Sequence, residues 1–370
     1  MTDTLPTTIS NWLEQNGAPL ADIAMIQPAD PFLDTAGEDL RRRIFITADQ
    51  TGANLCLRPE FTIPVCLHHL DSGSHAARYG YAGTVFRQRQ DEPHEFRQAG
   101  IEDLGNDNRI AADIAAITDC LDAMAEAGLS GLTLVLGDQS VFEAMLKGLN
   151  LPLAWQKRLG RAFGDTSRLK ADVARLAGEG ASETSNLPTE LEAAVLSGNA
   201  NEIGQWVADR MRVSGISVSA GRSPDEIAWR VLQKAELSAA RLDDAHRAAL
   251  ETFLAIDCPI AEAPARLREL AGRHGLELDA SITALASRVE GLAPIAGKVG
   301  AIRYRASFGR RLDYYTGLVF EVLAPEAAKP LAGGGRYDRL LSLLGSTREV
   351  PAVGFSIWLD RVANMLARAQ

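Results

Sequence analysis

The densest run of polar and aromatic residues lies between Arg78 and Glu102. At its centre, Asp-Glu-Pro at residues 91–93 is typical of a turn, so the run is predicted to form a β-hairpin. Side chains alternate between the two faces of a strand, and Arg87 on the first strand can face the same space as alternate residues of the second. A cation, a carboxylate, an amide and an aromatic ring would then surround a gap left by a glycine; the alternative is an ordinary solvated face of the sheet. The residues expected to share this face are Phe96, Gln98, Gly100 and Glu102.

A second polar segment, Arg58-Pro59-Glu60-Phe61-Thr62, precedes an apolar stretch that predicts a helix over 63–70. Glu60 and Thr62 are two residues apart and would point the same way if the segment is extended. A carboxylate beside a hydroxyl suits the binding of an ammonium group. The same two residues also fit an ordinary capping pair at the start of the helix, and both interpretations stay open.

Two segments nearer the end of the chain also contain clustered polar residues. Residues 310–317 are rich in charged and aromatic side chains. The glycine run at 333–335 lacks the Lys-Ser/Thr ending of a phosphate-binding loop and is interpreted as a turn. None of the six histidines has metal-ligand spacing, and the four cysteines form no Cys-x-x-Cys pair. The sequence therefore predicts neither a metal site nor a disulfide framework.

Strand patterns occur on both sides of a long helical block. Between residues 146 and 295, Ala, Leu, Arg and Glu dominate and strand patterns nearly vanish. This order indicates an α+β core that is interrupted by a helical insertion. The predicted parts are a first core segment over 1–145, the insertion over 146–295 and a second core segment over 296–370. The expected strands are 44–47, 54–57, 132–136, 302–305, 314–323 and 352–357; the expected helices are 107–127, 224–237, 240–254 and one at the end of the chain, with loops at 180–182 and 214–223.

The charge balance restricts the class of partner. The 370 residues include 38 Lys and Arg against 48 Asp and Glu, which gives a net charge of -10. A nucleic-acid partner requires a basic surface, so this balance argues against one. The start of the chain has no signal-peptide pattern, and no apolar stretch approaches the ~20 residues that a membrane span requires. We therefore expect a soluble, cytoplasmic protein with no nucleic-acid or membrane partner.

Taken together, the polar segments resemble the catalytic core of class II aminoacyl-tRNA synthetases, in particular histidyl-tRNA synthetase. The resemblance runs from about residue 10 to the C-terminus, except in the helical block. It implies a class II core, in which an antiparallel sheet is flanked by helices. Residues 17–28 are a weaker match to the first class motif, which forms the dimer interface in that class. The matching segments are Arg58-Pro59-Glu60-Phe61-Thr62, Phe86-Arg87, Gln98-Ala99-Gly100-Ile101-Glu102, Leu312-Asp313-Tyr314-Tyr315, Ala332–Asp338 and Ala352–Arg361.

Several features depart from the synthetase pattern. The sequence ends nine residues after Arg361, where a synthetase continues into an anticodon-binding domain, so no such domain is expected. The turn before Gln98 is short and acidic, whereas the synthetase loop is longer and basic because it holds ATP and tRNA. His94 stands in place of an arginine and Phe61 in place of a glycine, although Arg310 matches the histidine-specific catalytic arginine.

This combination resembles the regulatory subunits of ATP phosphoribosyltransferase, which are synthetase paralogues that have lost tRNA charging. The resemblance implies a non-catalytic chain without a cofactor, needed for the first step of histidine biosynthesis and involved in feedback by histidine. The transferase chemistry would belong to a partner, the short-form catalytic subunit. The chain itself would form a homodimer, and free histidine would be its ligand.

The resemblance also implies a histidine pocket. A zwitterion needs acceptors for its ammonium group and a cation for its carboxylate, and an imidazole donor needs a buried acceptor. The implied positions are Glu60, Thr62 and Gln98 for the ammonium group, Glu102 and Tyr314 for the imidazole, Tyr315 in the same set, and Arg310 for the carboxylate.

Nucleotide-binding positions are implied as well: Arg87 and Arg361 for phosphates and Phe96 for adenine. The alternative here is that inherited arginines persist as structural ion pairs. Two other hypotheses remain for the whole chain. One is a truncated synthetase-like ligase that activates histidine or a related amino acid, and the other is a structural scaffold with a relict pocket.

Overall fold

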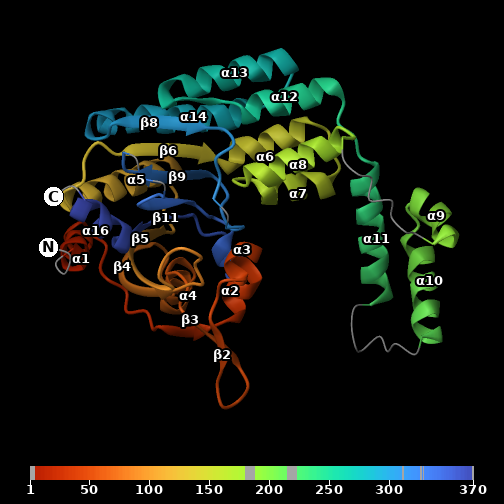
Figure 1. Ribbon diagram of the computed structural model, residues 1–370, viewed down its shortest axis with the longest axis horizontal. Helices are drawn as coiled ribbons and strands as arrows, with labels where there is room; N and C mark the ends of the chain where they lie inside the picture. Colours follow the sequence, from red (N-terminus) through yellow and green to blue (C-terminus); the bar gives the residue numbers. More distant parts are fainter. Residues whose placement is uncertain are drawn as a thin grey trace. The chain divides into compact units, whose positions relative to one another are not determined.

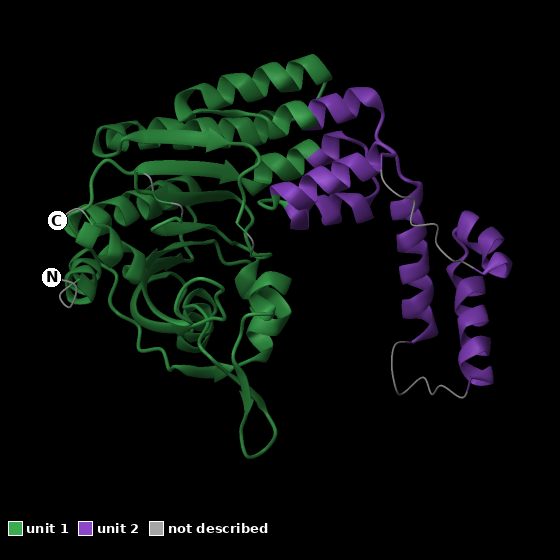
Figure 2. Cartoon of the chain, in the orientation of Figure 1, with its two compact units in different colours: residues 1–145, 163–165, 251–370 green, residues 146–162, 166–250 purple. Residues whose placement is uncertain are grey.

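The computed structural model describes residues 5–179, 188–214, 223–310, 312–325, 327 and 329–368. The loop expected at 180–182, and most of the one expected at 214–223, lie outside these residues. Contacts divide the chain into two compact units, coloured separately in Figure 2. The first unit comprises Met1–Met145, Phe163–Asp165 and Glu251–Gln370, and the second comprises Leu146–Ala162 and Thr166–Leu250.

In the described part of the chain, the first unit contains an eight-stranded sheet (Figure 1). Its strands are β4 (Ala77–Phe86), β5 (Glu95–Leu104), β6 (Thr133–Asp138), β7 (Asp257–Pro259), β8 (Ala301–Arg305), β9 (Leu318–Leu323), β10 (Ala332–Arg336) and β11 (Ala352–Trp358). The strand order is β4-β5-β11-β10-β9-β6-β8-β7. Neighbours are antiparallel except for β6 and β8, which are parallel. This order places β5 directly beside β11, although about 250 residues separate them in sequence.

Helices cover the sheet of the first unit. α5 (Arg109–Glu126) packs on β10 and β11 and also contacts α1 (Leu5–Gln15) and α14 (Asp279–Leu292). On the other hand, α4 (Thr62–Ser72) contacts β5 and α15 (Leu340–Leu343). Asn108 caps the start of α5 by accepting a hydrogen bond from the backbone N–H of Ala111. The helices are α1 (Leu5–Gln15), α2 (Asp30–Thr35), α3 (Glu38–Arg41), α4 (Thr62–Ser72), α5 (Arg109–Glu126), α13 (Ala263–His274), α14 (Asp279–Leu292), α15 (Leu340–Leu343) and α16 (Leu359–Arg368), with 3-10 turns η2 (Ile260–Glu262) and η3 (Ala293–Lys298).

The second unit is built of helices, with no strand among its described residues. It contains α7 (Leu153–Ala162), α8 (Thr166–Leu176), α9 (Thr189–Leu196), α10 (Ala200–Val213) and α11 (Pro224–Ala239), while α6 (Gln139–Gly148) and α12 (Asp244–Leu254) cross its boundaries. A capping box at Ser223 and Glu226 starts α11, next to a proline at its first turn. The helical block defined by composition extends to residue 295, but residues 251–295 belong to the first unit, where α14 packs on α5.

A smaller sheet of three strands completes the first unit. Its strands are β1 (Ile26–Pro28), β2 (Ile46–Ala48) and β3 (Asn54–Leu57), in the order β1-β3-β2. The hairpin predicted over 44–57 corresponds to β2 and β3, which pair in antiparallel register. No described helix is both long enough and apolar enough to cross a membrane.

Two predicted elements differ from the structure. The strand expected over 314–323 begins only at Leu318, because the residues before it form turns. The glycine run interpreted as a turn is β10, a strand in the middle of the sheet. Glycine is needed in this strand because side chains and backbone approach closely: a Cβ at Gly333 would overlap Arg310, and one at Gly334 would overlap the carbonyl of Gly354.

Candidate functional site

A single cavity of the first unit is lined by all seven residues implied for histidine. The space among its lining atoms is about 410 Å³, including the opening to solvent. Its walls come from the start of α4, from β4 and β5, from the segment before β9 and from β10 and β11. The seven residues are Glu60, Thr62, Gln98, Glu102, Arg310, Tyr314 and Tyr315, and Arg87 lines the cavity beside them.

Glu60 performs the capping role that the sequence left open, and it also faces the cavity. Its two carboxylate oxygens accept the backbone N–H groups of Thr62 (2.6 Å) and Ile63 (2.9 Å), the first residues of α4. The segment is not extended as assumed for an ammonium pair, because Phe61 has right-handed helical φ and ψ angles. Burial raises the pKa of the Glu60 carboxyl, and these two donors and Arg87 oppose that shift.

Glu102 is the most enclosed acid of the cavity. Its side chain accepts hydrogen bonds from the Thr62 hydroxyl (2.7 Å) and from the Tyr337 hydroxyl. It also lies against β11, where a Cβ at Gly354 would overlap its Oε2 atom. Burial raises the pKa of Glu102 to about 8, with the Tyr337 and Thr62 hydrogen bonds opposing that shift. The cavity thus holds a carboxyl group that retains its proton near neutral pH.

Arg310 supplies the cation of the cavity. Its guanidinium group makes long contacts, at 3.4 Å, to the Phe320 carbonyl and to the Glu321 carboxylate. Its Nε–H group is buried and has no hydrogen-bond partner among the described residues. Gly333 lets the guanidinium lie against β10, because any side chain there would overlap it. A buried guanidinium with spare donors suits an incoming carboxylate.

Gln98 links three side chains at the floor of the cavity. With its amide oriented to satisfy its neighbours, the oxygen accepts from Arg87 (3.0 Å), from the Trp358 indole (3.2 Å) and from the Ser356 hydroxyl (3.2 Å). Arg87 also donates to the Pro59 carbonyl at 2.7 Å, and burial lowers its pKa to about 10. Since the Gln98 oxygen already has three donors, the Glu60 carboxylate is the more available acceptor for an ammonium group.

Phe61, which stands where the synthetase motif has a glycine, fills space beside the cavity with its ring. Its ring stacks on Tyr81, with 4.5 Å between ring centres, and the guanidinium of Arg58 lies 4.0 Å from its other side. Gly83 makes room for it, because a Cβ there would lie 3.1 Å from the ring. Arg58 bonds to the carbonyls of Ile23 and Thr84, so its place in the motif is structural.

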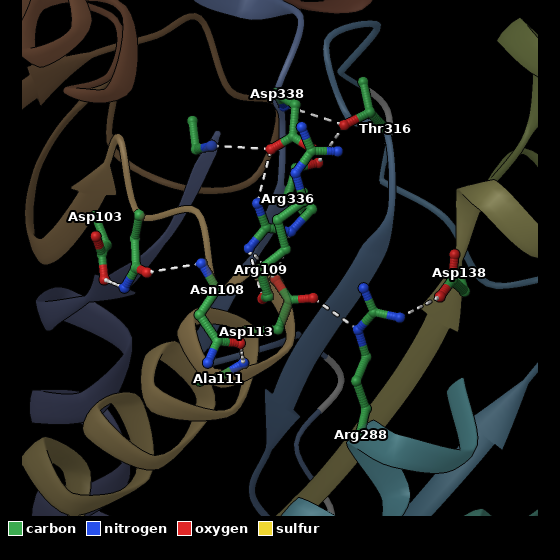
Figure 3. A network of polar contacts seen from close by, with 12 residues as sticks. Asp103, Asn108, Arg109, Ala111, Asp113, Asp138, Arg288, Thr316, Arg336 and Asp338 are labelled. Atoms are coloured by element: carbon green, nitrogen blue, oxygen red, sulfur yellow. Dashed lines mark hydrogen bonds and ion pairs between the residues drawn. The ribbon is translucent and has the colours of Figure 1, made fainter. Parts of the chain in front are cut away.

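Tyr337 also lines the cavity, although no sequence pattern singled it out. The residues on either side of it, Arg336 and Asp338, belong to a buried ionic network, which Figure 3 shows. Arg336 pairs with Asp113 of α5 and with Asp338, each at 2.7 Å. Asp113 also pairs with Arg288 of α14 at 2.6 Å. Because successive residues point to opposite sides, the network on one side of β10 fixes the tyrosine that contacts Glu102 on the other.

Two of the three implied nucleotide positions do not line the cavity. Arg361 forms a two-pronged ion pair with Glu92, at 2.9 and 3.0 Å, and donates to the Pro330 carbonyl at 2.7 Å. Phe96 is covered by the guanidinium of Arg89, 4.0 Å from the ring centre. Of the three positions, Arg87 alone faces the cavity in the described structure. The acidic turn therefore engages Arg361, one of the arginines that resemblance assigned to phosphate.

Comparison with known proteins places the chain in a family. The model of the histidyl-tRNA synthetase family matches residues 2–214 and 227–362. The ATP phosphoribosyltransferase regulatory subunit of Chelativorans sp. (strain BNC1) is 48% identical, covering 99% of both chains. That of Rhizobium leguminosarum bv. trifolii (strain WSM2304) is 50% identical, covering 92% of this chain and 91% of the relative. The chain belongs to the family of ATP phosphoribosyltransferase regulatory subunits.

Solved structures agree with the class II fold. A regulatory subunit/histidyl-tRNA synthetase from Bacillus halodurans superposes with a TM-score of 0.67 at 20% identity, covering 99% of this chain and 79% of that one. A histidine–tRNA ligase subunit from Alicyclobacillus acidocaldarius gives 0.65 at 22% identity, covering 100% and 94%. The fold is therefore that of the class II synthetases, as the sequence predicted. The names of the relatives favour the regulatory subunit over the truncated ligase.

Proposed function

We propose that this regulatory-subunit homologue binds free histidine in the described cavity and transmits its presence to a separate catalytic subunit. The partner is the short-form ATP phosphoribosyltransferase, and the phosphoribosyl transfer takes place on that partner. Histidine biosynthesis would then respond to histidine through a chain that performs no chemistry itself.

The observation that carries this proposal is the complementarity of the cavity to a histidine zwitterion. Arg310 has a buried N–H that no described residue accepts, for the carboxylate. Glu60 lies just before the start of α4 and lines the cavity, for the ammonium group. Glu102, between two hydroxyl groups, is placed for an imidazole nitrogen. Each polar part of the ligand meets a group of opposite or complementary character.

A homodimer is supported by the exposure of the small sheet. β2 is exposed along its whole length, and β1 is exposed at both ends. Met25, Ile26 and Ile46 each expose more than half of their surface, at 57%, 57% and 53%. Exposed apolar side chains are common singly, but a group on a thin sheet is typical of an interface. Two-fold pairing through this sheet would cover them.

Mixing the chain with the short-form catalytic subunit tests the proposed function. Phosphoribosyl transfer to ATP should start or rise strongly on mixing, and histidine should then lower it. Histidine-dependent exchange of pyrophosphate into ATP should stay at background. Exchange well above background would favour the ligase instead, and a transferase rate that ignores the added chain would refute the regulatory role. Light scattering of the chain alone should give the mass of a dimer.

A further inference from the structure

Four charged side chains converge at the acidic turn between β4 and β5. Glu92 lies at the centre: its carboxylate contacts Arg361 at 2.9 Å, Arg89 at 2.8 Å and Lys329 at 3.0 Å. The guanidinium of Arg361 faces both carboxylate oxygens, which is the geometry that arginine adopts with carboxylates and phosphates alike. One acid therefore occupies a site that three cations surround.

The cluster has more capacity for anions than Glu92 uses. The side chain of Arg89 is 8% exposed, and its Nε and Nη1 groups have no hydrogen-bond partner among the described residues. Besides Glu92, Arg89 contacts one acid, Asp360, at 3.2 Å among the residues that the structure describes. Buried guanidinium N–H groups are normally satisfied, so two orphans on one arginine indicate room for further acceptor oxygens.

The cluster adjoins the histidine cavity. Arg361 lies 4.8 Å from the centre of the Trp358 ring, and Trp358 lines the cavity. Arg87, another lining residue, lies 5.3 Å from the Phe96 ring, whose face is also covered by Arg89. A ligand that extended from the cavity with a phosphate chain would thus meet these cations next. Glu92 itself does not line the cavity.

We propose that Glu92 is an internal substitute for a phosphate group: it occupies the cation cluster and so restricts the neighbouring pocket to a free amino acid, excluding nucleotides. The inference rests on the proposed histidine pocket, since it defines what that pocket rejects. The exclusion does not depend on pH in the physiological range, because the surrounding cations lower the pKa of Glu92 to about 2 and it remains ionised. A regulatory chain of this kind would not compete for ATP.

Calorimetric titration with ATP tests the inference on the full chain. Glu92→Ala removes the resident carboxylate, and it should bind ATP about 10- to 150-fold more tightly than wild type, the range of a hydrogen bond between charged groups. Glu262→Ala is the matched control, because it removes the same charge from an exposed pair with Arg266; its ATP binding should equal that of wild type. Adding Arg361→Gln to the Glu92→Ala chain should abolish the gain.

Several outcomes would overturn the inference. The inference is wrong if wild type and Glu92→Ala bind ATP with the same affinity. It is also wrong if Glu92→Ala gains as much affinity for adenosine, which has no phosphate, as it gains for ATP. If Glu92→Ala does not fold, Glu92→Gln keeps the side-chain volume and loses only the charge; it should still gain ATP binding, and no gain would reject the idea. Histidine titrated into the same variants reports separately on the proposed function, because Glu92 lies outside the cavity.

Discussion

Two buried carboxyl groups on either side of β10 have opposite surroundings. Glu102 and Asp113 are each 1% exposed. Glu102 receives two neutral hydroxyl groups, contacts no cation within ion-pair distance among the described residues, and faces the cavity. Asp113 receives two guanidinium groups, from Arg288 and Arg336, one on each oxygen. The two acids are equally buried, but the charge of Asp113 is neutralised by the protein, whereas Glu102 has no cation to pair with in the described part of the chain. We call the surroundings of Asp113 complete and those of Glu102 incomplete.

This difference between the surroundings of Glu102 and Asp113 distinguishes an acid that stabilises the fold from an acid that can bind a ligand. Charges that the protein itself pairs hold elements together: Asp113 joins α5, α14 and β10. Burial raises the pKa of both acids, but two guanidinium groups oppose that shift at Asp113, whereas only hydroxyl groups oppose it at Glu102, whose pKa rises to about 8. A buried acid without a cation is costly to the fold. A ligand that brings the missing donor relieves this cost, so such a residue marks a binding site rather than a scaffold.

The largest effect should come from breaking the complete side. Asp113→Ala leaves two buried guanidinium groups without their acid, which should lower the free energy of unfolding by about 3–5 kcal/mol in urea titrations. Asp257→Ala is the control, because its pairs with Arg303 and Arg305 are exposed and should contribute less than about 1 kcal/mol. A loss below about 1 kcal/mol for Asp113→Ala would contradict the assignment of the network to stability.

Changing the incomplete side should affect binding instead. Glu102→Ala should weaken histidine binding by about 10- to 150-fold, because Glu102 and the imidazole hold one proton between them and a charge-assisted hydrogen bond of this kind contributes roughly 1.5–3 kcal/mol. Glu102→Gln should weaken it less, since the amide can still accept one bond from the imidazole. His75→Ala, outside the cavity, serves as the control in the same calorimetric titrations. Glu102→Ala that binds like wild type would remove this residue from the site.

Many of the elements and cavity residues in this comparison could be predicted from the sequence, because local sequence patterns identify them. The helix over α5, the strands β6 and β11 and the seven cavity positions all followed from periodicity or from motif resemblance. The glycine run of β10 was misinterpreted because turn composition and a crowded central strand look alike locally. What requires glycine there is the approach of Arg310 and of β11, which no local pattern records.

The contacts of two residues could not be predicted from the sequence, although both residues lie in segments that it singled out. Tyr337 acts through Glu102, 235 positions away, and Glu92 through Arg361, 269 positions away. The acidic character of the turn was visible, but only the fold brings it against the cations. The boundary of the helical block differed for a similar reason: α13 and α14 are helical by composition, yet α14 packs on α5 of the first unit.

The smallest expected effect is the pH dependence of histidine binding. With a pKa of about 8 for Glu102 and about 6.5 for a free imidazole, the pair holds one proton between these values. Below about pH 6.5 Glu102 and the imidazole together hold two protons, and one must be released on binding. Above about pH 8 they hold none, so the proton that they would share is missing. Affinity should therefore be greatest between about pH 6.5 and 8 and fall by up to about tenfold per pH unit outside it.

Glu102→Gln supplies the control for this profile, because an amide does not titrate. The fall above pH 8 should be smaller in that variant, and what remains reports the ligand's own amino group. A wild-type affinity that stays level from pH 7 to 9, or that matches the variant throughout, would show that Glu102 does not share a proton with the ligand.

Calorimetric titration of free histidine into the wild-type chain tests the central claim most directly. The claim is that the incomplete polar groups around the cavity, above all Glu102 and Arg310, are completed by this amino acid. The account predicts saturable binding of histidine, one molecule per cavity, in the absence of any partner or nucleotide. No heat of binding up to millimolar histidine, with the chain folded, would contradict it.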